Sequence, residues 1–173
     1  MIGRPIGRHF LLSVLLGCFA GCTGYTLGPT PPTFMKGVRR VAVPVFKNTT
    51  ITPHIEAIAT STVIKQIQED GTYEVTGADQ ADAIVVGTIQ SVERTKARSL
   101  QGNVLASSEF NLRVTLNFRI ERPNTSQVMG QKVVEGDTSF FVGNDVASQE
   151  REAIPLGVQD AATQFVSFLS EGW

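Results

Sequence analysis

Histidine and cysteine are the scarcest reactive residues of this 173-residue chain, which holds two of each. Both cysteines, Cys18 and Cys22, lie near the N-terminus, so no disulfide framework can stabilise the rest of the chain. The histidines are His9 and His54, which excludes a His-rich metal site and leaves any His-containing triad dependent on His54 alone. We expect His54 to be an exposed residue at a helix start. The sequence therefore predicts a non-enzymatic protein without metal or other cofactor.

Long apolar runs are also missing. The apolar segment Phe10–Ala20 has roughly half of the about 20 residues that a helix needs to cross a bilayer. Two arginines precede it and a Gly-Cys pair follows it, which is typical of a bacterial lipoprotein signal. We expect residues 1–21 to be the signal peptide and Cys22 to carry the lipid. Cys18 is the alternative acylation site, and removal of both cysteines by a different peptidase is a third interpretation.

A strong excess of either charge is absent as well. Two of the 15 Lys and Arg residues lie in the expected signal, which leaves 13 basic against 16 acidic residues and a net charge of −3. This balance does not indicate a nucleic-acid binder. Residues 22–37 are rich in Gly, Pro and Thr, and we expect them to form an extended tether. Residues 38–173 then suffice for a single domain with a sizeable core.

Apolar periodicity predicts the first half of this domain. Residues 39–46 are dense in β-branched residues and predict a strand, in which Pro44 marks an edge or a bulge. Thr52-Pro53 is typical of a helix start, and apolar residues then recur at three- and four-residue steps. The expected elements are, in order, strand 39–46, a helix that begins at Thr52-Pro53 and stops at Asp70-Gly71, strands 73–75 and 83–92, and a polar hairpin loop over 93–108.

The second half carries the clearest pattern. Apolar and polar residues alternate from Phe110 to Glu121, which predicts a long strand with one buried and one polar face. A turn leads into a second strand at 127–141, and the last segment has an apolar helical stripe in which Pro155 is tolerable only near the start or at a kink. This order predicts an α+β domain. We expect a two-layer sandwich with two helices on one face of a mixed, largely antiparallel sheet of four to five strands.

Two groups of polar residues are candidates for binding. The polar face of the long strand presents Asn111, Arg113, Thr115, Asn117 and Arg119. Within 93–108, basic residues occupy every second position, and side chains two apart on an extended arm point the same way. Such a row could hold several phosphates or carboxylates, although a solubilising surface is the alternative. This row consists of Arg94, Lys96 and Arg98.

Several segments between Cys22 and the C-terminus occur in an order that resembles a known family. They are Cys22-x-Gly24-Tyr25-x-Leu27, the strand Val41–Phe46 followed by Lys47-Asn48-Thr49 and a helix, Ala81-Asp82-Ala83 before a strand with Gly87, the long alternating hairpin, and an Ala-rich last helix. The chain resembles the outer-membrane lipoproteins of lipopolysaccharide assembly, the LptE family. The order and the coverage carry this resemblance, because no single segment is specific.

The resemblance implies a two-layer α/β sandwich and a place inside a large outer-membrane β-barrel, the component-D type of the lipopolysaccharide transport machine. The protein would plug that barrel, assist its assembly and help to deliver lipopolysaccharide to the cell surface. It would be held by its lipid at the periplasmic face of the outer membrane. The polar strand face would suit a polar barrel lumen. Basic residues of the family are implicated in contacts with lipopolysaccharide phosphates, and from charge and placement we nominate Arg94, Lys96, Arg98 and Lys132.

Two other classes share part of this pattern. Lipoprotein activators of peptidoglycan synthases and subunits of outer-membrane secretion pores also have an early Val-Ala-Val-x-x-Phe-x-Asn-Thr strand followed by a helix, so residues 41–67 do not separate the classes. The long alternating strand and its hairpin partner favour the transport family. A periplasmic hydrolase needs a nucleophile and a base within reach of each other, and the few reactive residues of this chain argue against such a pair.

Overall fold

A computed structural model describes residues 31–98, 108–142 and 145–172. The expected signal, both candidate lipidated cysteines and residues 22–30 of the expected tether lie outside these ranges. The described elements are the 3-10 helix η2 (Thr33–Met35), β1 (Arg40–Ala42), β2 (Lys47–Asn48), α2 (Ile55–Asp70), β3 (Glu74–Val75), β4 (Ala83–Arg98), β5 (Ser108–Glu121), β6 (Val128–Val142) and α3 (Val146–Glu171).

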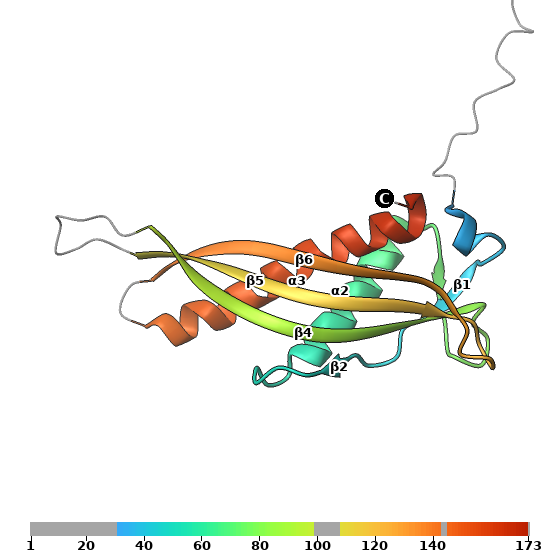
Figure 1. Cartoon of the computed structure of the whole chain (residues 1–173), viewed down its shortest axis with the longest axis horizontal. Coiled ribbons are helices and arrows are strands. Elements are labelled where there is room, and N and C mark those ends of the chain that lie inside the picture. Colours follow the sequence, from blue (N-terminus) through green and yellow to red (C-terminus); the bar gives the residue numbers. More distant parts are fainter. Residues whose placement is uncertain (1–30, 99–107, 143–144, 173) are drawn as a thin grey trace, which may run out of the picture.

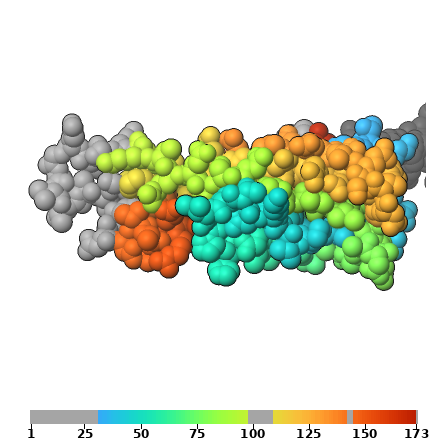
Figure 2. Space-filling view, turned by 60° about the horizontal axis from the view of Figure 1, so that its bottom comes forward, coloured from blue at the N-terminus to red at the C-terminus, as the bar shows by residue number. Residues whose placement is uncertain are grey.

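The expected α+β sandwich is confirmed: one mixed sheet forms the first layer, and α2 and α3 form the second layer on one of its faces (Figure 1). The strands follow the order β3-β1-β4-β5-β6, and β2 pairs with β4 beside β1. β1 is parallel to β3 and β4, whereas β4, β5 and β6 are antiparallel. In the space-filling view, α2 and the beginning of α3 lie along one side of the strand layer (Figure 2). Neither described helix has the length and apolarity that a bilayer crossing requires.

The alternation of β5 determines how the two layers pack. Every second residue of this strand, from Leu112 to Ile120, is fully buried beneath the helices. The Phe118 ring stacks on Phe165 of α3 with 3.7 Å between centroids and meets the edge of Phe46. Burial of such side chains contributes about 1.5–3 kcal/mol each, so β5 is the centre of the core.

Three expected boundaries are wrong. The single strand predicted over 39–46 is two short strands, β1 and β2, because the chain leaves the ladder around Pro44, which cannot donate a hydrogen bond. The sheet therefore has six strands. The predicted loop 93–108 is strand as far as Arg98, since β4 stays paired with β5. Helix α2 begins at Ile55 after an exposed His54 in the left-handed region (φ 63°), so Thr52-Pro53 is not its cap.

Helix α3 begins earlier than its apolar stripe indicated. The Asp145 side chain caps it by accepting hydrogen bonds from the backbone N–H groups of Ala147 and Ser148. These two bonds satisfy donors that a helix start leaves free. Hydrogen bonding from the Ser148 side chain, followed by that from the Ser148 backbone N–H, holds the pKa of Asp145 below its usual range. Pro155 lies within the helix rather than at its start. The first turns of α3 therefore extend toward the end of the sheet where β4 and β5 run beyond α2 (Figure 1).

Candidate functional site: the uncovered face of the sheet

No described element covers the face of the sheet opposite the helices, and this uncovered face is largely polar. On β5 it presents the five side chains nominated from the sequence, of which Asn111, Arg113 and Arg119 are exposed and Thr115 and Asn117 are half-buried. The register places polar residues of β4 and β6 beside them: Thr88 and Gln131 flank this row, and the Gln131 amide donates to the Asn117 side chain at 3.2 Å. The structure therefore brings the five predicted residues together as one row.

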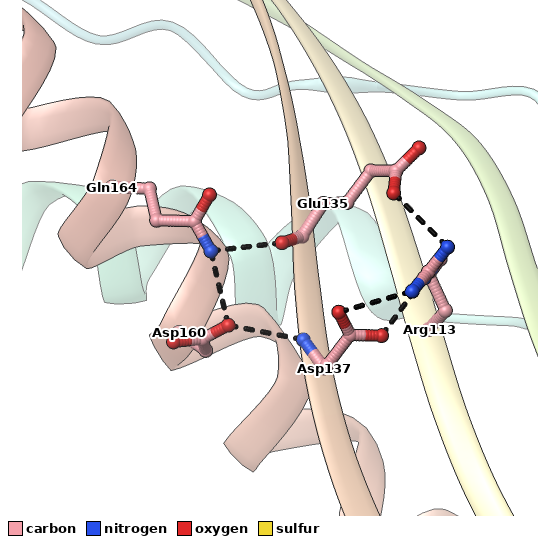
Figure 3. A network of polar contacts seen from close by, with 5 residues as sticks. All are labelled: Arg113, Glu135, Asp137, Asp160 and Gln164. Carbon is pink, nitrogen blue, oxygen red and sulfur yellow. Dashed lines mark hydrogen bonds and ion pairs between the residues drawn. The ribbon is translucent and has the colours of Figure 1, made fainter. Parts of the chain in front are cut away.

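Arg113 is the most strongly engaged side chain of this face. Its guanidinium donates to both carboxylate oxygens of Asp137, at 2.8 and 3.3 Å, and pairs with Glu135 at 3.1 Å (Figure 3). The hydrogen bonds to Asp137, followed by the charges of Asp137, Glu135 and Glu93, raise the pKa of Arg113 above its ordinary value. A planar guanidinium held by two carboxylates has a fixed orientation, so Arg113 presents a preformed ion-pair cluster to solvent.

Helix α3 also reaches the free edge of the sheet at this cluster. β6 pairs only with β5, so it is an edge strand. The Asp160 carboxylate accepts the backbone N–H of Asp137 at 3.0 Å, and the Gln164 amide donates to the carbonyl oxygen of Glu135 at 2.8 Å (Figure 3). These contacts occupy edge groups that would otherwise be free to pair with another strand.

The charge of the uncovered face is acidic. Alongside β5 from Asn111 to Glu121, the described residues place four carboxylates beside three cations: Arg113, Arg119 and Lys47 of β2, which is in register with Thr88 and Asn117. The carboxylates belong to Glu93, Glu121, Glu135 and Asp137. A shallow hollow of about 410 Å³ lies over the Arg113 cluster. The sequence analysis missed Glu93, Glu135 and Asp137, because their placement depends on the register of neighbouring strands. Glu121 lies within the predicted alternation of β5. Residues 127–141 do not alternate regularly between apolar and polar, so the local sequence held no signal for this placement.

No group of three or more His, Cys, Asp or Glu side chains that could hold a metal is found among the described residues. His54 is exposed and lies before α2, remote in sequence from the Arg113 cluster. What the face can do is present fixed charges, amides and hydroxyls to a polar partner.

The basic row predicted on the β4 arm is not a single row. Arg94 lies on the side of the sheet that carries the helices, over the Phe110 ring at 5.6 Å, and pairs with Glu150 of α3. Lys96 is opposite Phe110 and exposed. A register shift then follows, so that Arg98 is opposite Glu109 rather than in step with Lys96. The two-residue periodicity that motivated the prediction is therefore broken by an irregular position in the strand.

Lys132 lies far from this arm. Its ammonium group is 5.3 Å from the centre of the Phe168 ring, on the side of β6 that faces α3. Lys132 is opposite Phe118, whereas Lys96 is opposite Phe110, so the two lysines lie eight residues apart along β5. At about 3.4 Å per residue this separation is roughly 27 Å. The four nominated basic residues therefore do not converge on one site.

A second hollow, of about 560 Å³, lies at the opposite end of the sheet. It is lined by η2 and the residues after it, by Asp82, and by the connection between β5 and β6, including Lys36 and Arg122. The sequence analysis missed this site, because its lining comes from three segments that are far apart in the chain.

The comparisons with known proteins agree with this architecture. The family model described as LptE, lipopolysaccharide-assembly, matches residues 38–169. No curated protein matches the chain. Among solved structures, the PelC dodecamer from Paraburkholderia phytofirmans is similar over 82% of this chain and 94% of that chain, with 14% identity and a TM-score of 0.52. A putative neuraminyllactose-binding hemagglutinin homolog from Helicobacter pylori is similar over 87% and 93%, with 11% identity and a TM-score of 0.52. Protein XCC0632 from Xanthomonas campestris covers 75% and 82%, with 11% identity and a TM-score of 0.51. At these identities the likeness shows a shared fold alone.

Proposed function

The chain belongs to the LptE family of lipopolysaccharide assembly, whose model matches residues 38–169, and on this premise we propose that it is a non-enzymatic plug of a large outer-membrane β-barrel. In this role it is held by a lipid on Cys22, with Cys18 as the alternative, at the periplasmic face of the outer membrane. It helps the barrel to assemble and to deliver lipopolysaccharide to the cell surface.

The observation that carries the proposal is the uncovered polar face of β4, β5 and β6. The other face of the sheet is committed to α2 and α3, so a large partner meets this face without disturbing the core. Barrel lumens are polar, and a face of amides, hydroxyls and paired charges fits such a wall better than an apolar face would. The half-buried Thr115 and Asn117 lie in the middle of this face, flanked by β4 on one side and β6 on the other.

Direct contact with lipopolysaccharide phosphates remains a prediction for the nominated basic residues. Arg94 is the weakest of them, because Glu150 already neutralises its charge. Lys96 forms no ion pair within the described ranges and is exposed at the end of the arm. If the arm contacts phosphates, we therefore expect Lys96→Gln to reduce that contact more than Arg94→Gln does.

Co-purification tests the proposed plug. A tagged chain is expressed in its native host, the outer membrane is extracted in mild detergent, and the proteins that stay bound are identified. We expect a stoichiometric large barrel. Asn117→Trp places a bulky ring in the centre of the uncovered face and should reduce the recovered barrel at least about tenfold, which corresponds to about 1.4 kcal/mol.

The matched control is Lys65→Trp, because the Lys65 side chain on α2 is 75% exposed and lies on the helix layer. It should leave the barrel bound. Full recovery of the barrel with Asn117→Trp, or its loss with Lys65→Trp instead, contradicts docking through the sheet face. Recovery of a cell-wall synthase or of a ring of identical chains indicates the alternative classes.

A further inference from the structure

The hollow beside η2 is lined by polar residues and by two cations. Lys36 follows η2, and Arg122 begins the connection from β5 to β6. Both side chains line the same hollow of about 560 Å³, and both residues are exposed. Neither forms a salt bridge with any carboxylate of residues 31–98, 108–142 or 145–172. Figure 1 shows η2, β1 and the β5–β6 connection together at this end of the molecule.

Asp82 is the one carboxylate among the described residues that line the hollow, and its hydrogen-bonding capacity is already used. Asp82 accepts the backbone N–H groups of Arg39 and Arg40 at 3.2 and 2.9 Å, and the Arg40 guanidinium at 3.2 Å. These hydrogen bonds, led by the backbone N–H of Arg40, lower the pKa of Asp82 and keep it ionised. The Asp82 charge is therefore balanced by Arg40, and the charges that remain in the hollow are those of Lys36 and Arg122. Two uncompensated cations favour an anionic ligand.

The wall of the hollow is apolar on one side. Phe34 and Val128 contribute to the lining, and Val128 is 49% exposed although it is a β-branched hydrophobic residue. The Phe34 ring is held in place by stacking on Phe168 with 4.9 Å between centroids. A free inorganic anion has no apolar atoms to bury against an exposed valine, whereas an amphiphile gains free energy by burying its first acyl carbons there.

We propose that this hollow binds the phosphate of an anionic phospholipid from the membrane that carries the chain. The phosphate lies between Lys36 and Arg122, and the glycerol and first acyl carbons lie against Phe34 and Val128. The proposal rests on the lipid anchor at Cys22 but not on the barrel partner. The nine steps from Cys22 to Pro31 span at most about 30 Å when fully extended, so this end of the domain stays close to the lipid surface. Basic residues near an anionic surface are attracted to it.

Amide hydrogen exchange on the lipidated full chain tests the proposal. The chain is placed in nanodiscs of phosphatidylcholine with increasing fractions of phosphatidylglycerol, and no barrel is present. We expect exchange to slow at residues 33–38 and 122–129 as the phosphatidylglycerol fraction rises. Lys36→Gln and Arg122→Gln should each raise the fraction needed for half-maximal slowing about fivefold.

Lys47→Gln is the matched control, since it removes the same charge from an exposed residue of β2 that does not line the hollow. It should leave the titration unchanged. Equal slowing in the Lys36 and Arg122 variants, or no slowing at all, overturns the proposal. Slowing by inorganic phosphate added to phosphatidylcholine discs overturns the lipid assignment in favour of a free-anion site. A chain that does not enter the discs overturns the anchor on which the proposal rests. None of these outcomes depends on the barrel, so the plug is tested separately.

Discussion

At Gly136 the backbone of β6 lies close against the backbone of α3. A Cβ atom added there would lie 1.9 Å from the carbonyl oxygen of Gly157 and 2.6 Å from the backbone nitrogen of Ala161. Both atoms belong to the backbone of α3, so no side-chain rotation can relieve the overlap. Ordinary van der Waals contact begins near 3.4 Å, and Gly136→Ala therefore requires α3 and β6 to separate by about 1.5 Å.

The size of the effect follows from this displacement. Overpacking a close-packed core costs about 1–3 kcal/mol, and a gap of about 0.5–1 Å already forfeits a quarter to a half of the dispersion energy of the atoms on either side. The separation loosens a helix with ten buried residues. Restricting the unfolded chain by Gly→Ala returns about 0.4–1 kcal/mol. We expect a net loss of about 2 kcal/mol and a fall in Tm of about 4–8 °C.

Urea unfolding followed by far-ultraviolet circular dichroism measures this loss. The midpoint urea concentration should fall while the slope m stays constant, because the surface area that unfolding exposes does not change. Gly77→Ala is the control: its added Cβ would meet the flexible, exposed Asp79 carboxylate, so the change should stay within about 0.5 kcal/mol. If Gly136→Ala unfolds at the same urea concentration as the wild-type chain, the close contact between α3 and β6 is wrong.

Two further predictions concern pH and the sheet edge. Tyr73 donates to the carbonyl of Leu169 at 2.8 Å, and burial together with the Asp70 charge raises its pKa to about 12. Because the pKa of tyrosine in the unfolded chain is about 10, this stabilisation is complete below that pH and is lost as pH rises from 10 to 12. In thermal melts, Tyr73→Phe should cost about 1 kcal/mol at neutral pH and should make the fall of Tm between pH 10 and 12 less steep than in the wild-type chain. An equally steep fall in both proteins would contradict the assignment. The double substitution Asp160→Ala and Gln164→Ala should expose the β6 edge and cause self-association in light scattering, whereas Gln159→Ala should not. A monomeric double variant would show that these side chains do not protect the edge.

Strong local periodicity explains which elements the sequence could predict. The alternation between Phe110 and Glu121 allows only one arrangement on a sheet with one buried face, and β5 follows it residue by residue. The far part of β4 could not be recognised in this way. Residues 93–97 are exposed on both faces, so they have no apolar period, and they form a strand because β5 supplies its hydrogen-bonding partners. Pairing that is imposed by a neighbouring strand leaves no trace in the local sequence.

The same distinction holds for the candidate site. The row from Asn111 to Arg119 was predictable, because the face of a residue depends only on its parity within one strand. The partners of Arg113 were not, since the register that puts Asp137 opposite it depends on the turn and on an irregular position between Ile120 and Glu121. The side of the sheet on which Arg94 lies was equally hidden, because a register shift between Ile89 and Ser91 changes the phase of β4. One extra residue in a strand exchanges its two faces.

The hydrogen bonding of the sheet limits how any partner can recognise the uncovered face. β5 has paired neighbours along both of its sides, whereas β4 is paired on its outer side, among the described strands, only with β1 at Ala83–Ile84 and with β2 at Thr88–Ile89. At the middle of β6 the side chains of Asp160 and Gln164 occupy the edge. A partner that meets β5 on this face must therefore contact side chains instead of adding a strand, and strand addition is open to it along β4 beyond Ile89. Glu135 and Asp137 hold the Arg113 side chain in place before any partner binds, so Arg113 loses little side-chain entropy on binding. Because four carboxylates outnumber three cations on this face, a wall that supplies Lys or Arg side chains complements the face better than a wall of phosphates.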